Sequence, residues 1–284
     1  MKNIVIIPNM TKDGAGEVAR RLILRLSALG FSLYTSSTYK GELTDSVGYY
    51  DEFPSDADLI VVIGGDGSVL DASVQAIASD IPLIGVNLGK VGYLSEVEPD
   101  NLDVFERLLS GEYTVESKML LSVSLRKSDE ELTVSRLAVN DVVISHDSCL
   151  GIADFKVENS SSESVLYRAD GIILSTPSGS TAYSLSAGGP VVAHDVESIL
   201  VTPVCPHSFF NRSIIFNSGE RITVTNMGDN EMRVSVDGRV AASLKEQEKC
   251  TVEVSEKRLS VLTFSQNNMF STLFKKMRIM EDVK

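Results

Sequence analysis

The first hundred residues alternate between short apolar runs and segments whose apolar residues have helical spacing. The run 59–63 (LIVVI) contains no polar residue, which is typical of a strand covered on both faces of a parallel sheet. Helical spacing extends from Val18 to Leu29 and ends at Gly30. The same two patterns predict further strands at 3–7, 31–35 and 81–86 and further helices at 70–77 and 102–109.

From about residue 113 the period of the hydrophobic positions changes to two. Leu121, Val123 and Leu125 alternate with polar residues, as expected of a strand with one buried face. Similar runs occur at 132–139, 154–157, 222–224, 232–236, 251–254 and 259–264, and residues 269–280 have helical spacing.

These patterns predict two domains. The repeated order of strand, helix and strand predicts an α/β domain with a parallel, Rossmann-like sheet over residues 1–98. The runs of period two predict a mostly antiparallel β domain over residues 99–264, and a helix is expected at 265–284.

Composition limits the partners that the chain can have. Hydrophobic residues make up 43% and charged residues 23% of the 284 residues, which is typical of a globular protein. The net charge of −13 provides no basic surface for nucleic acid or for an anionic membrane, so neither partner is expected. A polyphosphate ligand would have to be attracted by local amides, a few cations and a metal ion that it brings itself.

The number and spacing of the cysteines indicate the redox state of the compartment in which the protein works. Cys149, Cys205 and Cys250 form no C-x-x-C pair and no even disulfide framework, so we expect them to be buried thiols in a reducing cytoplasm. The apolar run at the start of the chain stops at Pro8, and no apolar segment approaches the ~20 residues of a membrane-spanning helix. These features predict a soluble cytoplasmic protein.

The strongest local motif is the segment 64–68 (GGDGS), between an apolar strand and an amphipathic helix. Glycine lets the backbone approach a ligand closely, and the start of a helix presents unpaired N–H groups with a positive partial charge. This arrangement favours a phosphate-binding turn. The alternative is a hairpin turn, because Asp-Gly is a common hairpin pair, but the helical spacing after residue 68 argues against a following strand.

The motif is neither a P-loop nor a G-x-G-x-x-G fingerprint, so it has no P-loop lysine. Asp66 would lie near phosphate, where a carboxylate repels the ligand unless it takes a proton or faces a metal. We interpret Asp66 as a candidate general base, and the alternative is a helix cap. Lys12, after the first strand, is either a contact of the donor phosphates or an ordinary solvated lysine.

Four segments together resemble the NAD kinase family: 64–67 (GGDG), 87–94 (NLGKVGYL), Asn140-Asp141 and 170–186 (DGIILSTPSGSTAYSLS). They occur in the family's order and cover most of the chain, and the last is the most specific. The first alone is also similar to a motif in phosphofructokinases and lipid kinases. The resemblance implies phosphorylation of the adenosine ribose 2′-hydroxyl of NAD to give NADP, with ATP or polyphosphate as donor and a divalent metal such as Mg²⁺ carried by the phosphates.

The resemblance also implies a role for each matching residue. Asp66 corresponds to the proton acceptor, with Gly65 and Gly67 beside it. The positions implied to bind NAD are Tyr93 and Leu94 beside the nucleotide, Asn140 and Asp141 at the adenosine, Ser178, Thr181, Ala182, Tyr183 and Ser186 at the adenine pocket, and Arg168 and Asp170 toward the nicotinamide.

Two positions depart from the family's pattern. Position 141 is Asp where the family often has Glu, which shortens its reach. Asp237-Gly238 falls where some bacterial members have Asp-His, so an imidazole is missing there. Asp237 and Arg239 are candidates to face the ligand, and Asp237-Gly238 is also a good signal for a two-residue hairpin.

The sequence also leaves two alternative functions open. A lipid or sugar kinase could share the glycine-aspartate turn, and a sensor that binds a nicotinamide nucleotide without turnover could share the whole site. The resemblance implies a homodimer or homotetramer in which a neighbouring subunit completes the site, and a C-terminal helix that packs on the first domain.

Overall fold

The computed structural model describes residues 1–89, 92–126, 136–146, 151–264 and 273. The described residues divide into two compact units, Met1–Ser117 with those from Leu259 onward, and Lys118–Arg258. The first unit therefore extends 19 residues beyond the domain end at 98 that the sequence predicts. Apart from Leu273, the expected C-terminal helix lies outside the described residues.

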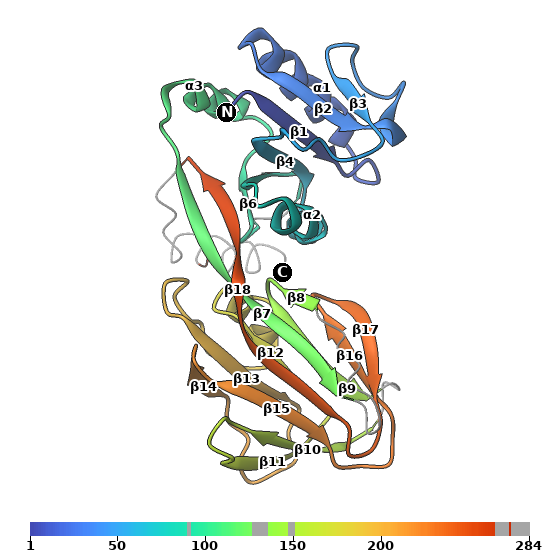
Figure 1. Cartoon of the computed structure of the whole chain (residues 1–284), viewed down its shortest axis with the longest axis vertical. Helices are drawn as coiled ribbons and strands as arrows, with labels where there is room; N and C mark the ends of the chain where they lie inside the picture. The colour runs from blue at the N-terminus through green and yellow to red at the C-terminus, as the bar shows by residue number, and fades with distance from the viewer. Residues whose placement is uncertain (90–91, 127–135, 147–150, 265–272, 274–284) are drawn as a thin grey trace, which may run out of the picture. The chain divides into compact units, whose positions relative to one another are not determined.

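The first unit is built on a parallel sheet, as the apolar runs predict (Figure 1). Its strand order is β18-β5-β4-β1-β2-β3, with β6 added to β5. The strands are β1 (Asn3–Pro8), β2 (Ser32–Ser36), β3 (Gly48–Tyr50), β4 (Leu59–Gly64), β5 (Leu83–Asn87), β6 (Ser95–Val97) and the end of β18 (Lys249–Thr263).

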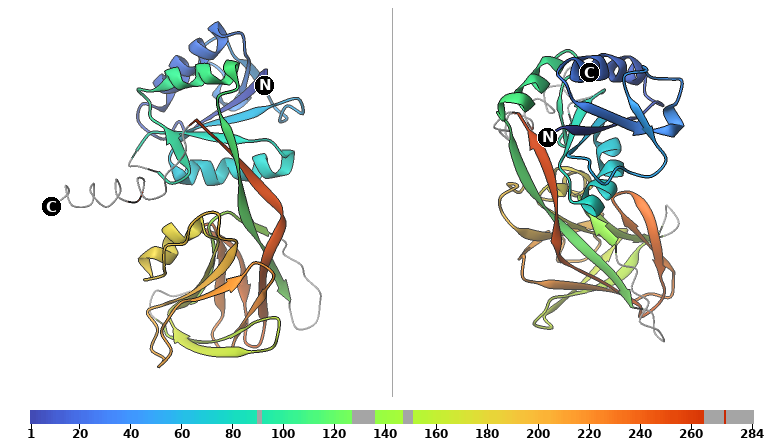
Figure 2. Two further views of the ribbon diagram at one scale, coloured as in Figure 1. Left: turned by 90° about the vertical axis from the view of Figure 1, so that its left-hand side faces the viewer. Right: turned by 45° about the horizontal axis from the view of Figure 1, so that its top comes forward.

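Helices cover both faces of this sheet, which explains why the central strand β4 carries no polar residue. In Figure 2, α1 (Ala15–Ala28) lies on one face and α2 (Asp66–Ser79) on the other. All six residues of β4 are buried. The main apolar cluster joins α1 to one face of the sheet, through residues such as Leu22, Ile6 and Val61. A short 3-10 turn, η1 (Ser37–Tyr39), follows β2.

The helix predicted at 102–109 is a 3-10 turn, η2 (Leu102–Glu106), followed by a single helical turn, α3 (Arg107–Ser110). Its apolar residues explain why the first unit continues past residue 98. Phe105 is fully buried in the cluster of this unit and packs edge-on against Phe264, with ring centroids 5.4 Å apart. Arg107 donates a hydrogen bond of 2.6 Å to the carbonyl of Phe264.

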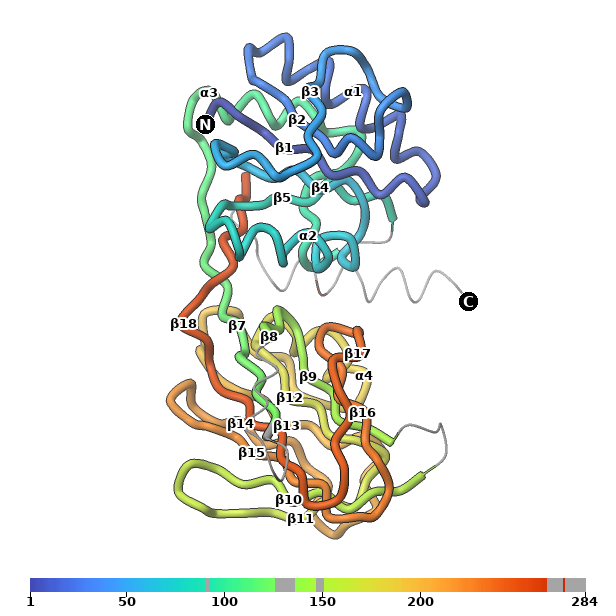
Figure 3. Tube along the Cα trace, turned by 45° about the vertical axis from the view of Figure 1, so that its right-hand side comes forward, coloured from blue at the N-terminus to red at the C-terminus, as the bar shows by residue number. Residues whose placement is uncertain are grey.

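The second unit consists of antiparallel strands in two sheets, again as predicted. Figure 3 shows their paths. One sheet contains β7 (Thr114–Arg126), β8 (Arg136–Ala138), β10 (Ala153–Glu158), β11 (Ser164–Ala169), β15 (Arg221–Asn226) and the first part of β18. The other contains β9 (Asp141–His146), β12 (Gly171–Ser175), β13 (Ser198–Val204), β14 (Ile214–Asn217), β16 (Met232–Val236) and β17 (Arg239–Leu244).

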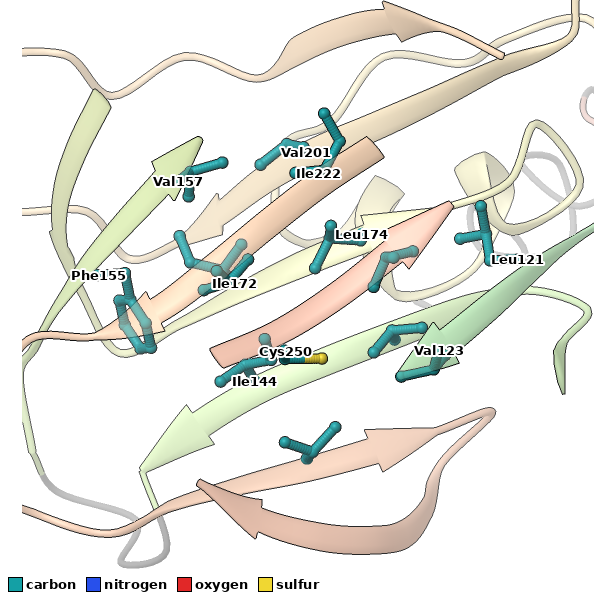
Figure 4. Packing of buried hydrophobic residues seen from close by; sticks show 14 of the residues in the cluster. Leu121, Val123, Ile144, Phe155, Val157, Ile172, Leu174, Val201, Ile222 and Cys250 are labelled. Carbon is teal, nitrogen blue, oxygen red and sulfur yellow. The ribbon is translucent and has the colours of Figure 1, made fainter. Parts of the chain in front are cut away.

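Alternate residues of these strands form the core of the second unit. Figure 4 shows apolar side chains from both sheets in one cluster, among them Phe155, Ile172 and Cys250. Cys250 is buried as expected, and burial raises the pKa of its thiol to about 12. The expectation for Cys205 is wrong: it follows the end of β13, has a φ of 45° and is exposed. Cys149 lies outside the described residues.

The two runs predicted at 251–254 and 259–264 belong to one strand of 15 residues, β18. The residues between them are polar, and Glu256 and Lys257 are exposed, which hides the continuity from a hydrophobic pattern. Within the described part of the chain, no helix is long and apolar enough to cross a membrane.

The core of the first unit predicts a matched pair of variants on one helix. Leu22→Ala removes a fully buried side chain of α1 and should lower the free energy of unfolding by about 2–5 kcal/mol. Leu24→Ala, at a position that is 55% exposed, should change it by less than about 0.5 kcal/mol. Urea unfolding of both variants checks this, and equal losses would show that α1 does not pack as described.

Candidate active site

The turn from β4 to α2 joins a buried strand directly to a helix. The carbonyl of Gly64 accepts a bond of 2.7 Å from the amide of Leu88, which links the ends of β4 and β5. A Cβ on Gly64 would overlap the side chain of Ser68, so only glycine fits there. Gly65 is the N-cap and α2 begins at Asp66. The hairpin alternative is therefore excluded at this motif.

The backbone amides in the first turn of α2 have the orientation that favours an anion. The amides of Ser68 and Val69 donate to the carbonyl of Gly65, at 2.9 and 3.1 Å, so Ser68 does not contribute its N–H as a free donor. The amides of Asp66 and Gly67 occupy the first helical positions, where no intrahelical acceptor exists. Gly67 is exposed and Gly65 half-buried. These positions have the polarity that binds phosphate at a helix N-terminus.

The side chain of Asp66 does not cap its own helix. It accepts hydrogen bonds from three consecutive backbone amides, those of Tyr93 (2.9 Å), Leu94 (3.1 Å) and Ser95 (3.3 Å), and from the Ser95 hydroxyl at 3.2 Å. A Cβ on Gly92 would overlap the Asp66 carboxylate, so glycine is required where the loop passes it. The structure therefore brings Asp66 together with Tyr93 and Leu94, two positions that the resemblance implies beside the nucleotide.

Tyr93 keeps a neutral hydroxyl beside this carboxylate. Its half-buried position raises the pKa of its phenol, and the charge of Asp66 raises it further. The ring can therefore offer a flat apolar face and a hydrogen-bond donor to a ligand.

A second aspartate organises Asn140 and Asp141 in the other unit. The carboxylate of Asp237 accepts bonds from the amides of Val139 (2.8 Å), Asn140 (2.8 Å) and Asp141 (3.1 Å). Asp237 and Gly238 have positive φ values of 47° and 77° and connect β16 to β17, which confirms the hairpin. Both oxygens of Asp237 are used by the backbone, so its side chain holds the Asn140-Asp141 segment in place.

The segment after β12 also holds the backbone next to Asn140 and Asp141. The amide of Thr176 donates to the carbonyl of Asn140 at 2.9 Å, and its hydroxyl donates to the carbonyl of Val139 at 2.7 Å. A Cβ on Gly179 would overlap the backbone of Asn140, so this close approach requires glycine. No sequence pattern indicates a role for Thr176 or Gly179, because both act by supporting the backbone of a residue far away in the chain.

Asp141 is a buried acid next to a second acid. Burial raises the pKa of Asp141 to about 7, and the charge of Asp237 contributes to this shift. Burial also raises the pKa of Asp237, but the three amides act in the opposite direction. Asp237 is therefore the member that keeps its charge, and Asp141 is the member that holds a proton as the pH falls through neutrality.

The remaining predicted residues fall into two groups. Ser178 and Thr181 are buried near Asn140, and Thr181 donates to the carbonyl of Ser178 at 3.1 Å. Ser178 and Thr181 are followed by a short helix, α4 (Tyr183–Ser186), which comes after the 3-10 turn η3 (Gly179–Thr181). Tyr183 and Ser186 lie on α4 and are exposed, and Ala182 before it is half-buried. Arg239, at the start of β17, is also exposed.

Arg168 and Asp170 lie at the opposite end of β12. Ser175 pairs with Asp141 and Gly171 with Ser145, so the two ends of β12 are about 13 Å apart at ~3.3 Å per residue. Both Arg168 and Asp170 are exposed. Within this unit the structure therefore does not bring them to Asn140 and Asp141.

The raised pKa of Asp141 predicts a pH-dependent stability. The unfolded carboxyl has its usual pKa of about 3.9, so the folded chain binds this proton more tightly and its free energy of unfolding falls as the pH rises toward 7. Asp141→Asn removes the titrating carboxyl and with it this decrease in the free energy of unfolding. From pH 5 to pH 8, the free energy of unfolding of the variant minus that of the original chain should therefore rise by about 2 kcal/mol, measured by urea unfolding.

Asp195→Asn is the matched control, because Asp195 is an exposed acid of the same unit. As a surface substitution it should change the free energy of unfolding by less than about 0.5 kcal/mol at either pH. A difference for Asp141→Asn that is equally constant from pH 5 to pH 8 would contradict the assignment of the proton to Asp141.

Comparisons with known proteins cover nearly the whole chain. A family model described as the ATP-NAD kinase N-terminal domain matches residues 4–113, and one described as the ATP-NAD kinase C-terminal domain matches residues 139–264. An NAD kinase of Geobacter sulfurreducens is 36% identical over 281 residues, which are 98% of this chain and 99% of that protein. An NAD kinase of Natranaerobius thermophilus is 32% identical over 283 residues, with 98% of each covered.

Two solved structures show the same fold. The crystal structure of yeast NADH kinase complexed with NADH has a TM-score of 0.86 at 23% identity, over 98% of this chain and 88% of that one. The structure of an NAD kinase from Archaeoglobus fulgidus in complex with ATP has a TM-score of 0.71 at 24% identity, over 98% and 99%. With two domain models in order and relatives matched from end to end, the chain belongs to the NAD kinase family.

Proposed function

We propose that this enzyme phosphorylates the adenosine ribose 2′-hydroxyl of NAD with ATP and so forms NADP. The observation that carries the proposal is the Asp66 carboxylate, held by amides 93–95 at the start of α2, in a chain whose full length matches proteins named NAD kinase. The comparisons do not favour the lipid kinase, sugar kinase or sensor alternatives.

Asp66 would act as the proton acceptor. A ribose hydroxyl is a poor nucleophile at neutral pH, and a positioned carboxylate helps by accepting its proton as the oxygen attacks the γ-phosphorus. The bond from that phosphorus to the β-phosphate oxygen then breaks and ADP leaves. The four hydrogen bonds to Asp66 fix where the carboxylate lies, and positioning dominates phosphoryl transfer.

The amides at the start of α2 would hold the donor phosphates. Those of Gly65, Asp66 and Gly67 are the candidates, with the positive end of the helix dipole behind them. We infer that Mg²⁺ arrives with the triphosphate and neutralises part of its charge, as phosphoryl transfer requires. This matters in a chain with a net charge of −13, whose long-range field repels a polyphosphate.

Asn140 and Asp141 would bind the adenosine of NAD. Asn140 has both a donor and acceptors for a ribose or purine, and Asp141 near pH 7 can either accept or donate a hydrogen bond. Their backbone is fixed by Asp237 and Thr176, so the two side chains are presented in one arrangement. In this proposal Asp237 is a positioning residue, while Thr181, Ala182 and Tyr183 line the adenine pocket.

Asp66→Asn tests the base directly. Because general-base assistance is worth about 10²–10⁴-fold, kcat for NADP formation should fall by that factor while the affinity for NAD, measured by calorimetry, stays close to the original value. Asp80→Asn, at the other end of α2, is the control, since asparagine tolerates the left-handed φ of 54° found there. Turnover near the original rate in Asp66→Asn would eliminate Asp66 as the base.

We further propose a homo-oligomer in which Arg168 and Asp170 serve the site of a neighbouring subunit. Support comes from their position, exposed and at the end of β12 away from Asn140 and Asp141. The binding site at Asn140 of one subunit would then be completed by residues of the next subunit.

We infer that the protein is located in the cytoplasm, because Cys205 and Cys250 are free thiols.

Complementation between two damaged subunits tests this arrangement. Asp66→Asn and Asp170→Ala, expressed separately, should each lose activity, and their mixed oligomer, isolated with two different tags, should recover part of it. A chain that carries both substitutions, mixed with itself, is the control and should stay inactive. No recovery in a verified mixed oligomer would show that each subunit completes its own site.

A further inference from the structure

The loop that connects β1 to α1 is hydrogen-bonded to the end of β4 and to the first turn of α2. The amide of Asn9 donates to the carbonyl of Ile63 at 2.8 Å, and its side-chain amide donates to the hydroxyl of Ser68 at 2.8 Å. Thr11 donates to the Asn9 side chain through its hydroxyl at 2.6 Å. The loop is therefore held at a set position relative to the residues proposed to bind phosphate.

Lys12 lies at the centre of this loop, and its backbone is bonded on both sides. Its amide donates to the carbonyl of Asn9 at 3.0 Å, and its carbonyl accepts from the amide of Ala15 at 3.2 Å. The side chain is half-buried rather than extended into solvent. Its surroundings therefore leave room for the other possibility considered from the sequence, a contact with the donor phosphates.

The ammonium group of Lys12 lies over two glycines of the candidate site. A Cβ on Gly65 would be 2.8 Å from Nζ of Lys12, and a Cβ on Gly89 would be 3.9 Å from it. The first distance is shorter than a real Cβ contact, so the charge occupies the space that opens because residue 65 has no side chain. Gly65 is also the N-cap of α2, and the first amides of a helix favour an anion.

No carboxylate within the described ranges forms an ion pair with Lys12, although the chain has 39 acidic residues. A positive charge at this position, without a carboxylate beside it, can attract a bound anion. Phosphate is such an anion, and lysine binds it as a compact charge with three donors.

We propose that Lys12 binds the triphosphate of the donor, together with the amides at the start of α2. The inference rests on the proposed function and extends it. The GGDG turn has no lysine of its own, unlike a P-loop, and here the cation comes from the loop after the neighbouring strand β1. Lys12 thereby offsets the repulsion between the triphosphate and the Asp66 carboxylate.

Three variants test the proposal in assays of NADP formation from NAD and MgATP. Lys12→Gln should raise the KM for ATP by about 10- to 100-fold, because a hydrogen bond from a charged group is lost, and should leave the KM for NAD unchanged. Lys12→Arg keeps the charge and should restore much of the ATP affinity. Lys40→Gln removes an exposed lysine of the same unit and should leave both values unchanged.

The outcomes separate this inference from the proposed function. An unchanged KM for ATP in Lys12→Gln, or an equal rise in both KM values with a lower melting temperature, overturns a role for Lys12 in donor binding. If the original chain makes no NADP, the proposed function fails, and the role of Lys12 is read from calorimetric binding of MgATP. Weaker binding in Lys12→Gln but not in Lys40→Gln supports it, and equal or undetectable binding in all three chains overturns it.

Discussion

The candidate residues of each unit depend on one kind of interaction, a carboxylate that accepts several consecutive backbone N–H bonds. Asp66 holds residues 93–95 in this way and Asp237 holds residues 139–141. Buried amides without a partner are costly, so each aspartate fixes the conformation of a loop that lies far from it in sequence. Gly92 makes room for the contact with Asp66, and Gly238 adopts the positive φ of the hairpin that carries Asp237.

These bonds also set the electrostatics. Because Asp237 is stabilised as an anion by three amides, the proton of the acidic pair belongs to Asp141, whose pKa rises to about 7. Asp141 can therefore act as donor or acceptor at neutral pH. Asp66 is held in the same manner, so the protein provides a carboxylate of defined position next to amides that would bind phosphate. In a strongly acidic chain, the repulsion between this carboxylate and a phosphate has to be offset by a nearby cation, and the ammonium group of Lys12 lies at Gly65 to do so.

The parallel sheet explains why these groups meet in the first unit. Strands β1, β4 and β5 are neighbours that run in the same direction, so their carboxyl ends lie at one edge. The loops that follow them carry Lys12, residues 64–68 and residues 92–95, three segments that are far apart in the sequence. Ligands of open α/β sheets bind at such an edge, and the positive end of α2 favours an anion there.

The sequence by itself determined the two kinds of sheet, the helices at α1 and α2, the strand-to-helix turn at residues 64–68 and the hairpin at Asp237-Gly238, because hydrophobic period and glycine placement are local properties. It did not determine that the first unit extends beyond residue 98, that β18 is continuous or that Cys205 is exposed, since these depend on packing partners. Only the tertiary structure decided which amides each aspartate holds and where the Lys12 ammonium lies. Those contacts join residues from different loops, and no local pattern records them.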